Sequence, residues 1–100
     1  MVIVAGFIDL DPNERAAYLV ARQRAIERTR AETGCREYVF SADSSDPGRV
    51  RVFEVWEREE DLDAHLALLS AAAPSPKIVS ESSRELLRYH VTGVGPLRSA

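Results

Sequence analysis

The order in which apolar side chains switch between a two-residue repeat and a helical repeat constrains the fold of this chain more than any other feature. Val2 to Leu10 is a nearly continuous apolar run of strand length, which is typical of a central strand covered on both faces. Cys35 to Ala42 and Arg49 to Arg58 alternate with the period of a strand, and turn-forming residues between them favour a hairpin. Leu86 to Val94 alternates in the same way and is predicted to be the last strand.

Helices are predicted between these strands, one after the first strand and one after the hairpin. Asp11 and Pro12 are typical of a helix start, with Asp11 as the N-cap, and the helix is predicted to run to about Glu32. A second helix is predicted from Glu59, where successive acidic residues suit the positive end of the helix dipole. The segment from Lys77 to Arg84 favours either a short helix or an irregular crossover.

Arginines occupy much of the first predicted helix. They could form an anion-binding stripe, but the glutamates among them and the acidic total charge favour a solvated face with helical ion pairs, which is our prediction. The opposite, apolar side is expected to face the sheet. The arginines are Arg15, Arg22, Arg24, Arg28 and Arg30, and the side predicted to face the sheet comprises Ala16, Leu19, Val20, Gln23, Ile26 and Thr29.

The order strand, helix, strand, strand, helix, strand predicts a ferredoxin-like α+β fold, in which helices cover one face of a four-stranded antiparallel sheet. The strands carry apolar or aromatic side chains on both faces, so the second face must also be buried. Packing two such sheets face to face in a homodimer meets this need. We therefore expect residues 1–100 to form one domain of a dimeric α+β barrel, with a short tail from about Gly95.

Composition and charge exclude several classes of function. The formal net charge of −3 provides no broad basic field, so we expect no nucleic-acid partner. The single cysteine, Cys35, cannot form an intramolecular disulfide, and no His or Cys spacing suits a metal, so no metal is expected and the cytoplasm is the expected compartment. The apolar N-terminus lacks the features of a signal peptide, and no segment is long enough to span a membrane.

Four short motifs occur in register along the chain and together carry a resemblance to a known family. The motifs are Glu32-Thr33-Gly34-Cys35-Arg36-Glu37-Tyr38, Ser41-Ala42-Asp43-Ser44-Ser45-Asp46-Pro47, Glu54-Val55-Trp56-Glu57 and Leu62-Asp63-Ala64-His65. In this order and spacing they resemble the antibiotic biosynthesis monooxygenase family. The resemblance implies a dimeric α+β barrel with a pocket between the helices and the helix-covered face of the sheet in each protomer.

The resemblance also implies an activity, because characterised members of the family include cofactor-free oxygenases of quinols and polycyclic phenols. It points to a monooxygenase that uses O2 and no cofactor to oxidise a small aromatic substrate. Haem-degrading members carry an Asn near the position of Phe7, which this strand lacks, so haem degradation is disfavoured. Many members also carry a second His after the first, which is missing here, and this favours the alternative of a non-catalytic or stress-associated barrel that only binds a small ligand.

His65 is the candidate catalytic residue. Oxygenation without a cofactor needs a base that favours the substrate's phenolate, and an imidazole titrates near neutral pH. His65 lies on the apolar stripe of the second predicted helix, and its position resembles a family site that often carries His or an aromatic residue. Lining of the pocket without catalysis, and simple packing with one hydrogen bond, are the alternatives.

Five further residues are candidates for substrate binding, and each has a structural alternative. Tyr38 and Phe7 are expected as cavity wall or core, with Tyr38 offering a hydroxyl donor. Trp56 could stack on a flat substrate, although a core anchor is the favoured interpretation. Arg88 and His90 share one face of the last strand, and either could orient an anionic oxygen or form an ordinary salt bridge.

Overall fold

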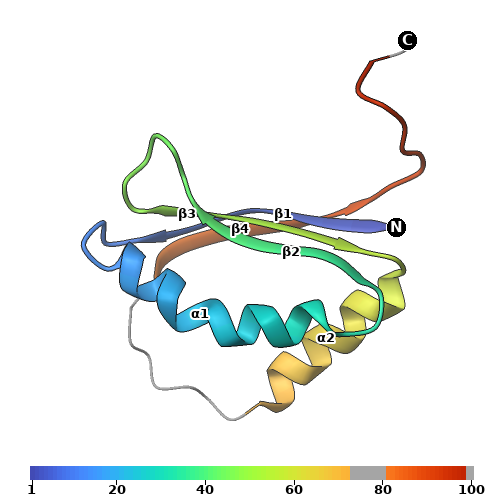
Figure 1. The fold of residues 1–100 in the computed structure, drawn as a ribbon, viewed down its shortest axis with the longest axis horizontal. Coiled ribbons are helices and arrows are strands. Elements are labelled where there is room, and N and C mark those ends of the chain that lie inside the picture. The colour runs from blue at the N-terminus through green and yellow to red at the C-terminus, as the bar shows by residue number, and fades with distance from the viewer. Residues whose placement is uncertain (73–80, 99–100) are drawn as a thin grey trace.

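The computed structural model describes residues 1–72 and 81–98, which form four strands and two helices. The elements are β1 (Val2–Leu10), α1 (Arg15–Arg30), β2 (Cys35–Ala42), β3 (Arg49–Trp56), α2 (Glu59–Ala71) and β4 (Glu81–His90). Every neighbouring pair in the sheet is antiparallel, in the order β2-β3-β1-β4, and both helices lie on the same face (Figure 1). This is the predicted ferredoxin-like α+β fold.

The core lies between the helices and one face of the sheet. Register pairs Val4 of β1 with Glu54 of β3, and Ile8 with Val50, so the even-numbered side chains of these strands point to the helices. Trp56, Ile8 and Val50 are almost wholly removed from solvent. Burial of each such apolar side chain contributes roughly 1.5–3 kcal/mol, which makes this face the main source of stability.

Several element boundaries differ from the sequence prediction, since β3 ends at Trp56 rather than Arg58 and β4 at His90 rather than Val94. Helix α1 begins at Arg15, because the Asp11 carboxylate accepts a hydrogen bond from the Asn13 amide at 2.8 Å and forms a separate turn before the helix. Strand β4 begins at Glu81, five residues before the predicted start at Leu86, because pairing with β1 extends the strand through a polar segment. Residues 77–80 of the ambiguous segment lie outside the described residues.

Helix α1 is rotated from the predicted orientation: Ile26, Thr29 and the half-buried Leu19 of the predicted side do face the core, but the other members of that side are exposed. Tyr18, Ile26 and Thr29 are buried and Arg22 is half-buried, whereas Val20 is 73% exposed. The side that includes Val20 was predicted to face the sheet because more apolar residues recur on it. The observed orientation buries the large aromatic ring of Tyr18 at the expense of Val20, which favours it because an aromatic ring removes more apolar area from water.

The other face of the sheet is not covered by the helices. Phe53, Leu87 and Tyr89 on this face are 39%, 46% and 48% exposed. Phe7 also lies here, with the Arg49 guanidinium 3.7 Å from its ring centroid. The described residues therefore leave an aromatic and apolar surface open to solvent on this side.

Gly34 fixes how the two helices approach each other. It has a φ of +78°, and a Cβ built on it would lie 2.1 Å from a carboxylate oxygen of Asp61 in the first turn of α2. Its carbonyl also accepts a hydrogen bond from the Glu57 amide at 2.8 Å. The turn after α1 and the start of α2 are thus in direct contact. No helix among the described residues is long and apolar enough to cross a membrane.

We predict that Gly34→Ala destabilises the protein. A positive φ is strained for alanine, and its methyl group would push against Asp61, so the free energy of unfolding should fall by about 1–3 kcal/mol. Urea unfolding measures this. Gly93→Ala is the matched control, because nothing lies within 4 Å of a Cβ at Gly93. Equal stability of the two variants would contradict the role assigned to Gly34.

Candidate functional site

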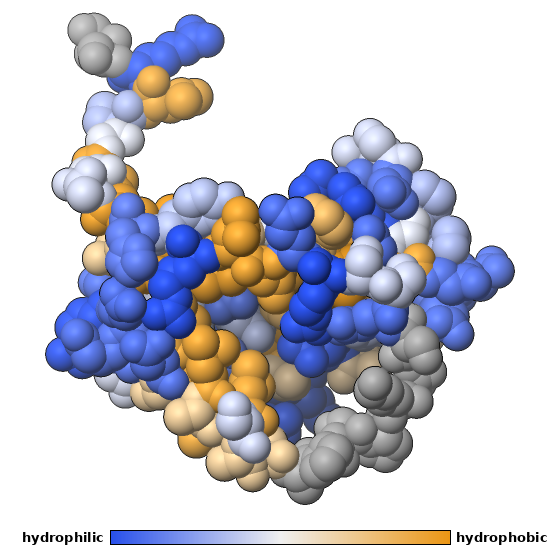
Figure 2. Space-filling model, turned by 180° about the vertical axis from the view of Figure 1, so that it is seen from behind, coloured by the Kyte–Doolittle hydropathy of each residue, from blue (hydrophilic) through white to orange (hydrophobic). Residues whose placement is uncertain are grey.

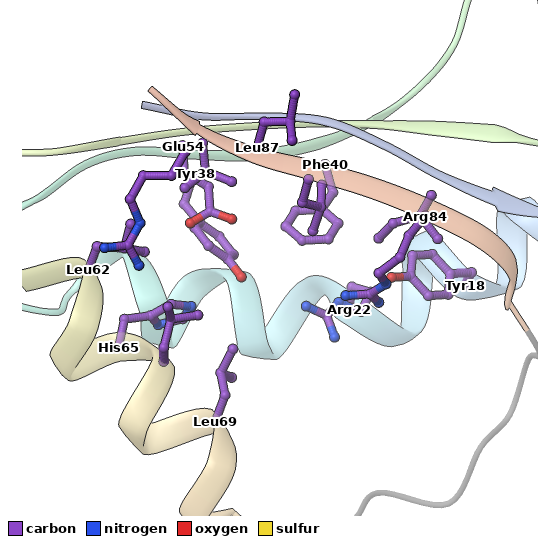
Figure 3. A pocket seen from close by; sticks show the side chains of 15 residues that line it. Tyr18, Arg22, Tyr38, Phe40, Glu54, Leu62, His65, Leu69, Arg84 and Leu87 are labelled. Carbon is purple, nitrogen blue, oxygen red and sulfur yellow. The ribbon is translucent and has the colours of Figure 1, made fainter. Parts of the chain in front are cut away.

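A cavity of about 290 Å³ lies between the two helices and the helix-covered face of the sheet. This volume is at the lower end of the ~300–1,000 Å³ typical of small-molecule sites. Apolar side chains gather on the face of the molecule where β4 is the edge strand, and the surface is hollowed there (Figure 2). The described lining residues are Val4, Ile8, Tyr18, Arg22, Tyr38, Phe40, Glu54, Leu62, His65, Leu66, Leu69, Arg84, Leu86, Leu87 and Arg88 (Figure 3).

His65 is held at one end of this cavity by aromatic rings. Its side chain is 2% exposed, and its ring centroid lies 5.0 Å from that of Trp56 and 5.4 Å from that of Tyr38. The residue follows Leu62 by three positions on α2, and both are buried on the side of the helix that packs against the sheet. The imidazole therefore has little rotational freedom.

Glu32 fixes the orientation of the His65 imidazole. Its carboxylate oxygens lie 3.0 and 3.2 Å from Nδ1 of His65. A carboxylate can only accept a hydrogen bond, so Nδ1 carries the hydrogen and Nε2 of the neutral ring is left as an acceptor. Nε2 has no hydrogen-bond partner among the described residues. This pairing of a carboxylate with an imidazole leaves Nε2 able to accept a proton.

Two buried groups beside His65 have raised pKa values. Glu54 accepts a hydrogen bond from Nε1 of Trp56 at 3.0 Å, and burial raises the pKa of Glu54. Burial, together with the nearby negative charge of Glu54, raises the pKa of Tyr38 to about 12. Tyr38 thus keeps its hydroxyl hydrogen at neutral pH and can donate it to an oxygen in the cavity.

Arg22 lies at the other end of the cavity in Figure 3, toward Tyr18 and Arg84. Its guanidinium carbon is 4.8 Å from the centroid of the Phe40 ring and 5.9 Å from that of Tyr18. Nε of Arg22 is buried and has no hydrogen-bond partner in the described part of the chain. The cation is therefore held by aromatic rings rather than by an acid.

Only some of the site residues predicted from the sequence line the cavity. His65, Tyr38 and Arg88 line the cavity. Trp56 is 0% exposed and lies behind His65 in the core, where it supports the ring without lining the cavity. Its position agrees with the core anchor that was favoured over a stacking surface.

Phe7 and His90 lie outside the cavity. Phe7 is an odd-numbered residue of β1, and strand alternation turns its side chain to the face away from the helices. His90 does share a strand face with Arg88, but it lies at the end of β4, where its Nε2 is 2.8 Å from the Glu59 carboxylate. This exposed contact with a carboxylate corresponds to the ordinary salt bridge that was the alternative to substrate binding for His90.

Three residues of the site were not found by sequence reasoning: Glu32, Arg22 and Tyr18. Glu32 is in the turn after α1, where no periodicity distinguishes a site residue from a surface one. Arg22 follows Tyr18 by four positions and precedes Ile26 by four, so all three share one side of α1. This spacing indicated that Arg22 lies on the buried side of the helix. Its positive charge favoured a solvent-exposed position instead, so the sequence analysis did not select it.

The fold and this cavity define a ferredoxin-like protein with a small-molecule pocket between helices and sheet. The antibiotic biosynthesis monooxygenase family model matches residues 1–72, and the chain belongs to this family. A curated relative, an uncharacterised protein of Synechocystis, is 34% identical over 64 residues. That match covers 64% of this chain but only 44% of the relative, so the chain spans less than half of its length.

Solved structures carry the same fold. A Deinococcus radiodurans protein described as a putative antibiotic biosynthesis monooxygenase is 24% identical with a TM-score of 0.82, and the match covers 99% of this chain and 100% of that one. The haem degrader MhuD of Mycobacterium tuberculosis, whose structure holds two haems in its active site, is 17% identical with a TM-score of 0.74. That match covers 95% of this chain and 100% of MhuD. At these identities the likeness concerns the fold alone.

We predict that Glu54→Gln stabilises the protein in a pH-dependent manner. Because burial raises the pKa of Glu54, the unfolded chain ionises first as pH rises above about 4.3, and the wild type loses stability through this window. The amide retains an oxygen to accept from Trp56 without a buried charge. The difference in unfolding free energy between variant and wild type should therefore grow as the pH rises above about 4.3 and level off once the folded-state carboxyl is also ionised, as measured by urea unfolding.

Glu57→Gln, on an exposed side chain just after the same strand, is the matched control. Its difference from the wild type should change much less over this range. A pH-independent difference for Glu54→Gln would mean that the fold tolerates the ionised carboxylate.

Proposed function

We propose that this protein is a cofactor-independent monooxygenase that oxidises a quinol or another small polyphenol with O2. The observation that carries the proposal is the pairing of Glu32 with the buried imidazole of His65 at the end of an aromatic-lined cavity. The family membership supports the same class of reaction. His65 is the proposed catalytic base, and Tyr38 and Arg88 are proposed substrate contacts.

The proposed reaction begins with proton transfer. Nε2 of His65 accepts the phenolic proton of the substrate, while Glu32 holds the imidazole by Nδ1 and stabilises the imidazolium that forms. The Tyr38 hydroxyl donates a hydrogen bond to the developing phenolate oxygen. The apolar walls keep water away from the reactive intermediates.

The substrate itself supplies the electrons for oxygen activation. The phenolate transfers one electron to O2, and the resulting superoxide couples with the phenoxyl radical at a ring carbon that bears hydrogen. As the O–O bond breaks, the ring hydrogen leaves with the outer oxygen as hydroxide, and the carbon becomes a carbonyl. Hydroxide then takes the proton from His65 and leaves as water. One oxygen atom enters the quinone product and the other enters water, so no external reductant is needed.

We predict that His65→Gln slows oxygen uptake with a panel of naphthohydroquinones by about tenfold or more, because the proton acceptor is lost. Glu32→Gln should also lower turnover and should shift its pH profile, because the amide no longer stabilises the imidazolium. An oxygen electrode measures both rates against an enzyme-free control, which corrects for autoxidation.

His90→Gln is the matched control for these variants, because His90 lies outside the cavity and pairs with Glu59. Its turnover should equal that of the wild type. If the wild type binds the hydroquinones but does not accelerate oxygen uptake, the enzyme proposal fails. The alternative, a barrel that only binds a small ligand, then remains.

We further propose that the protein is a homodimer joined through the open faces of its sheets. The exposed aromatic and aliphatic side chains of that face support this arrangement, since contiguous apolar surface on a small protein usually marks an interface. Phe53 on the central strand β3 is at the middle of the proposed contact.

We predict that Phe53→Glu converts the dimer to a monomer, because the new carboxylate would be buried against the partner's apolar face. Sedimentation velocity at micromolar concentration measures the change. Val20→Glu is the matched control, because Val20 is 73% exposed on α1, far from the open sheet face. A wild type that sediments as a monomer at this concentration would disprove the dimer.

A further inference from the structure

The contacts of Arg22 within the protein leave part of its hydrogen-bonding capacity unused. Its side chain extends from α1 into the cavity, where it contacts the rings of Phe40 and Tyr18. A buried guanidinium normally forms hydrogen bonds with a carboxylate or with backbone carbonyls. No ion pair to Arg22 is present among the described residues, and its Nε is buried without a partner; the polar side chain that its guanidinium approaches is the Tyr38 hydroxyl.

The other arginines of the cavity differ from Arg22 in this respect. Arg84 forms a two-point ion pair with Glu81, and Arg88 contacts Glu59 and Asp63, each at 3.0 Å. Their charges are compensated by acids at the rim. Among the three arginines in the described lining, Arg22 is thus the one with unused hydrogen-bonding capacity.

Glu54, the acidic residue of the described lining, does not compensate Arg22 either. Its carboxyl accepts its hydrogen bond from Trp56 on the sheet side of the cavity. In Figure 3, Glu54 and His65 lie toward one end and Arg22 toward the other, and the Tyr38 hydroxyl points toward Arg22. The cavity therefore offers a proton acceptor at one end, a cation at the other and a hydroxyl between them.

We propose that Arg22 binds a carboxylate substituent of the ligand, so that the preferred substrates are aromatic hydroxy acids rather than neutral phenols. This inference rests on the proposed function of the pocket. The ligand's phenolic ring is at the His65 end, and its carboxylate accepts paired hydrogen bonds from the guanidinium of Arg22. Stacking on Phe40 and Tyr18 holds the guanidinium plane in place before the ligand arrives, which lowers the entropic cost of binding.

Equilibrium binding of two matched probes under argon tests the inference. The probes are 6-hydroxy-2-naphthoate and its methyl ester, which carry the hydroxyl and the carboxyl group at opposite ends of the same two rings and differ in charge. Quenching of the fluorescence of Trp56 reports binding, because the indole lies against His65. The wild type should bind the acid at least about tenfold more tightly than the ester. Arg22→Gln should abolish this preference by weakening the acid alone, and Arg22→Lys should retain part of it.

Arg24→Gln is the matched control, because it removes the same charge from an exposed position on α1 and should leave the preference unchanged. Circular dichroism and thermal melting establish that each variant is folded. Equal affinity of the wild type for both probes, or a preference that survives in Arg22→Gln, would overturn the inference. The assay involves no turnover, so a failure of the monooxygenase proposal in the oxygen-uptake experiment is distinguishable from a failure here.

Discussion

The close approach between Gly34 and Asp61 is the constraint on which the proposed site depends. Because glycine carries no side chain, the first turn of α2 can lie directly against the turn that ends α1. Glu32, two residues before Gly34, is thereby brought to His65, one helical turn after Asp61. A carboxylate and an imidazole that are 33 residues apart in the chain thus meet because of one backbone contact. Local packing at the ends of the helices creates the pair, rather than a motif on either helix.

The parts of the fold that were predictable are those in which hydrophobic alternation determines burial. The observed bounds of β1 and β2 and the start of α2 equal the predicted ones, since in each case the pattern changes sharply at the boundary. The start of β4 was not predictable from alternation. Glu81 to Arg84 form part of an edge strand, where polar side chains are favourable because they discourage pairing with other chains. Pairing with β1, rather than side-chain pattern, makes this segment a strand.

The site was predictable only where a candidate side chain lay on an apolar stripe. His65 was found because a titratable ring among buried leucine positions is unusual. Phe7 was misplaced because its strand is apolar on both faces, so composition gave no information about which face meets the helices. Arg22 was assigned to a solvated face, because single-sequence reasoning places arginines in water unless a specific partner is known. The partners here are the rings of Phe40 and Tyr18, which are identifiable only after the helix has been docked on the sheet.

The charge of the cavity also explains why an acidic ligand would suit a protein that is acidic overall. The chain has a formal net charge of −3, yet the described lining of the cavity contains three arginines and a single glutamate. Burial raises the pKa of that glutamate, Glu54, and so favours its neutral form. Arg84 and Arg88 are paired with acids, so the uncompensated positive charge is that of Arg22, and inside a partly apolar cavity it is screened less than the charges on the outer surface. An anionic ring system would therefore gain its electrostatic stabilisation inside the pocket. The same field favours the phenolate over the phenol, so one set of charges would support both binding and the first step of oxidation.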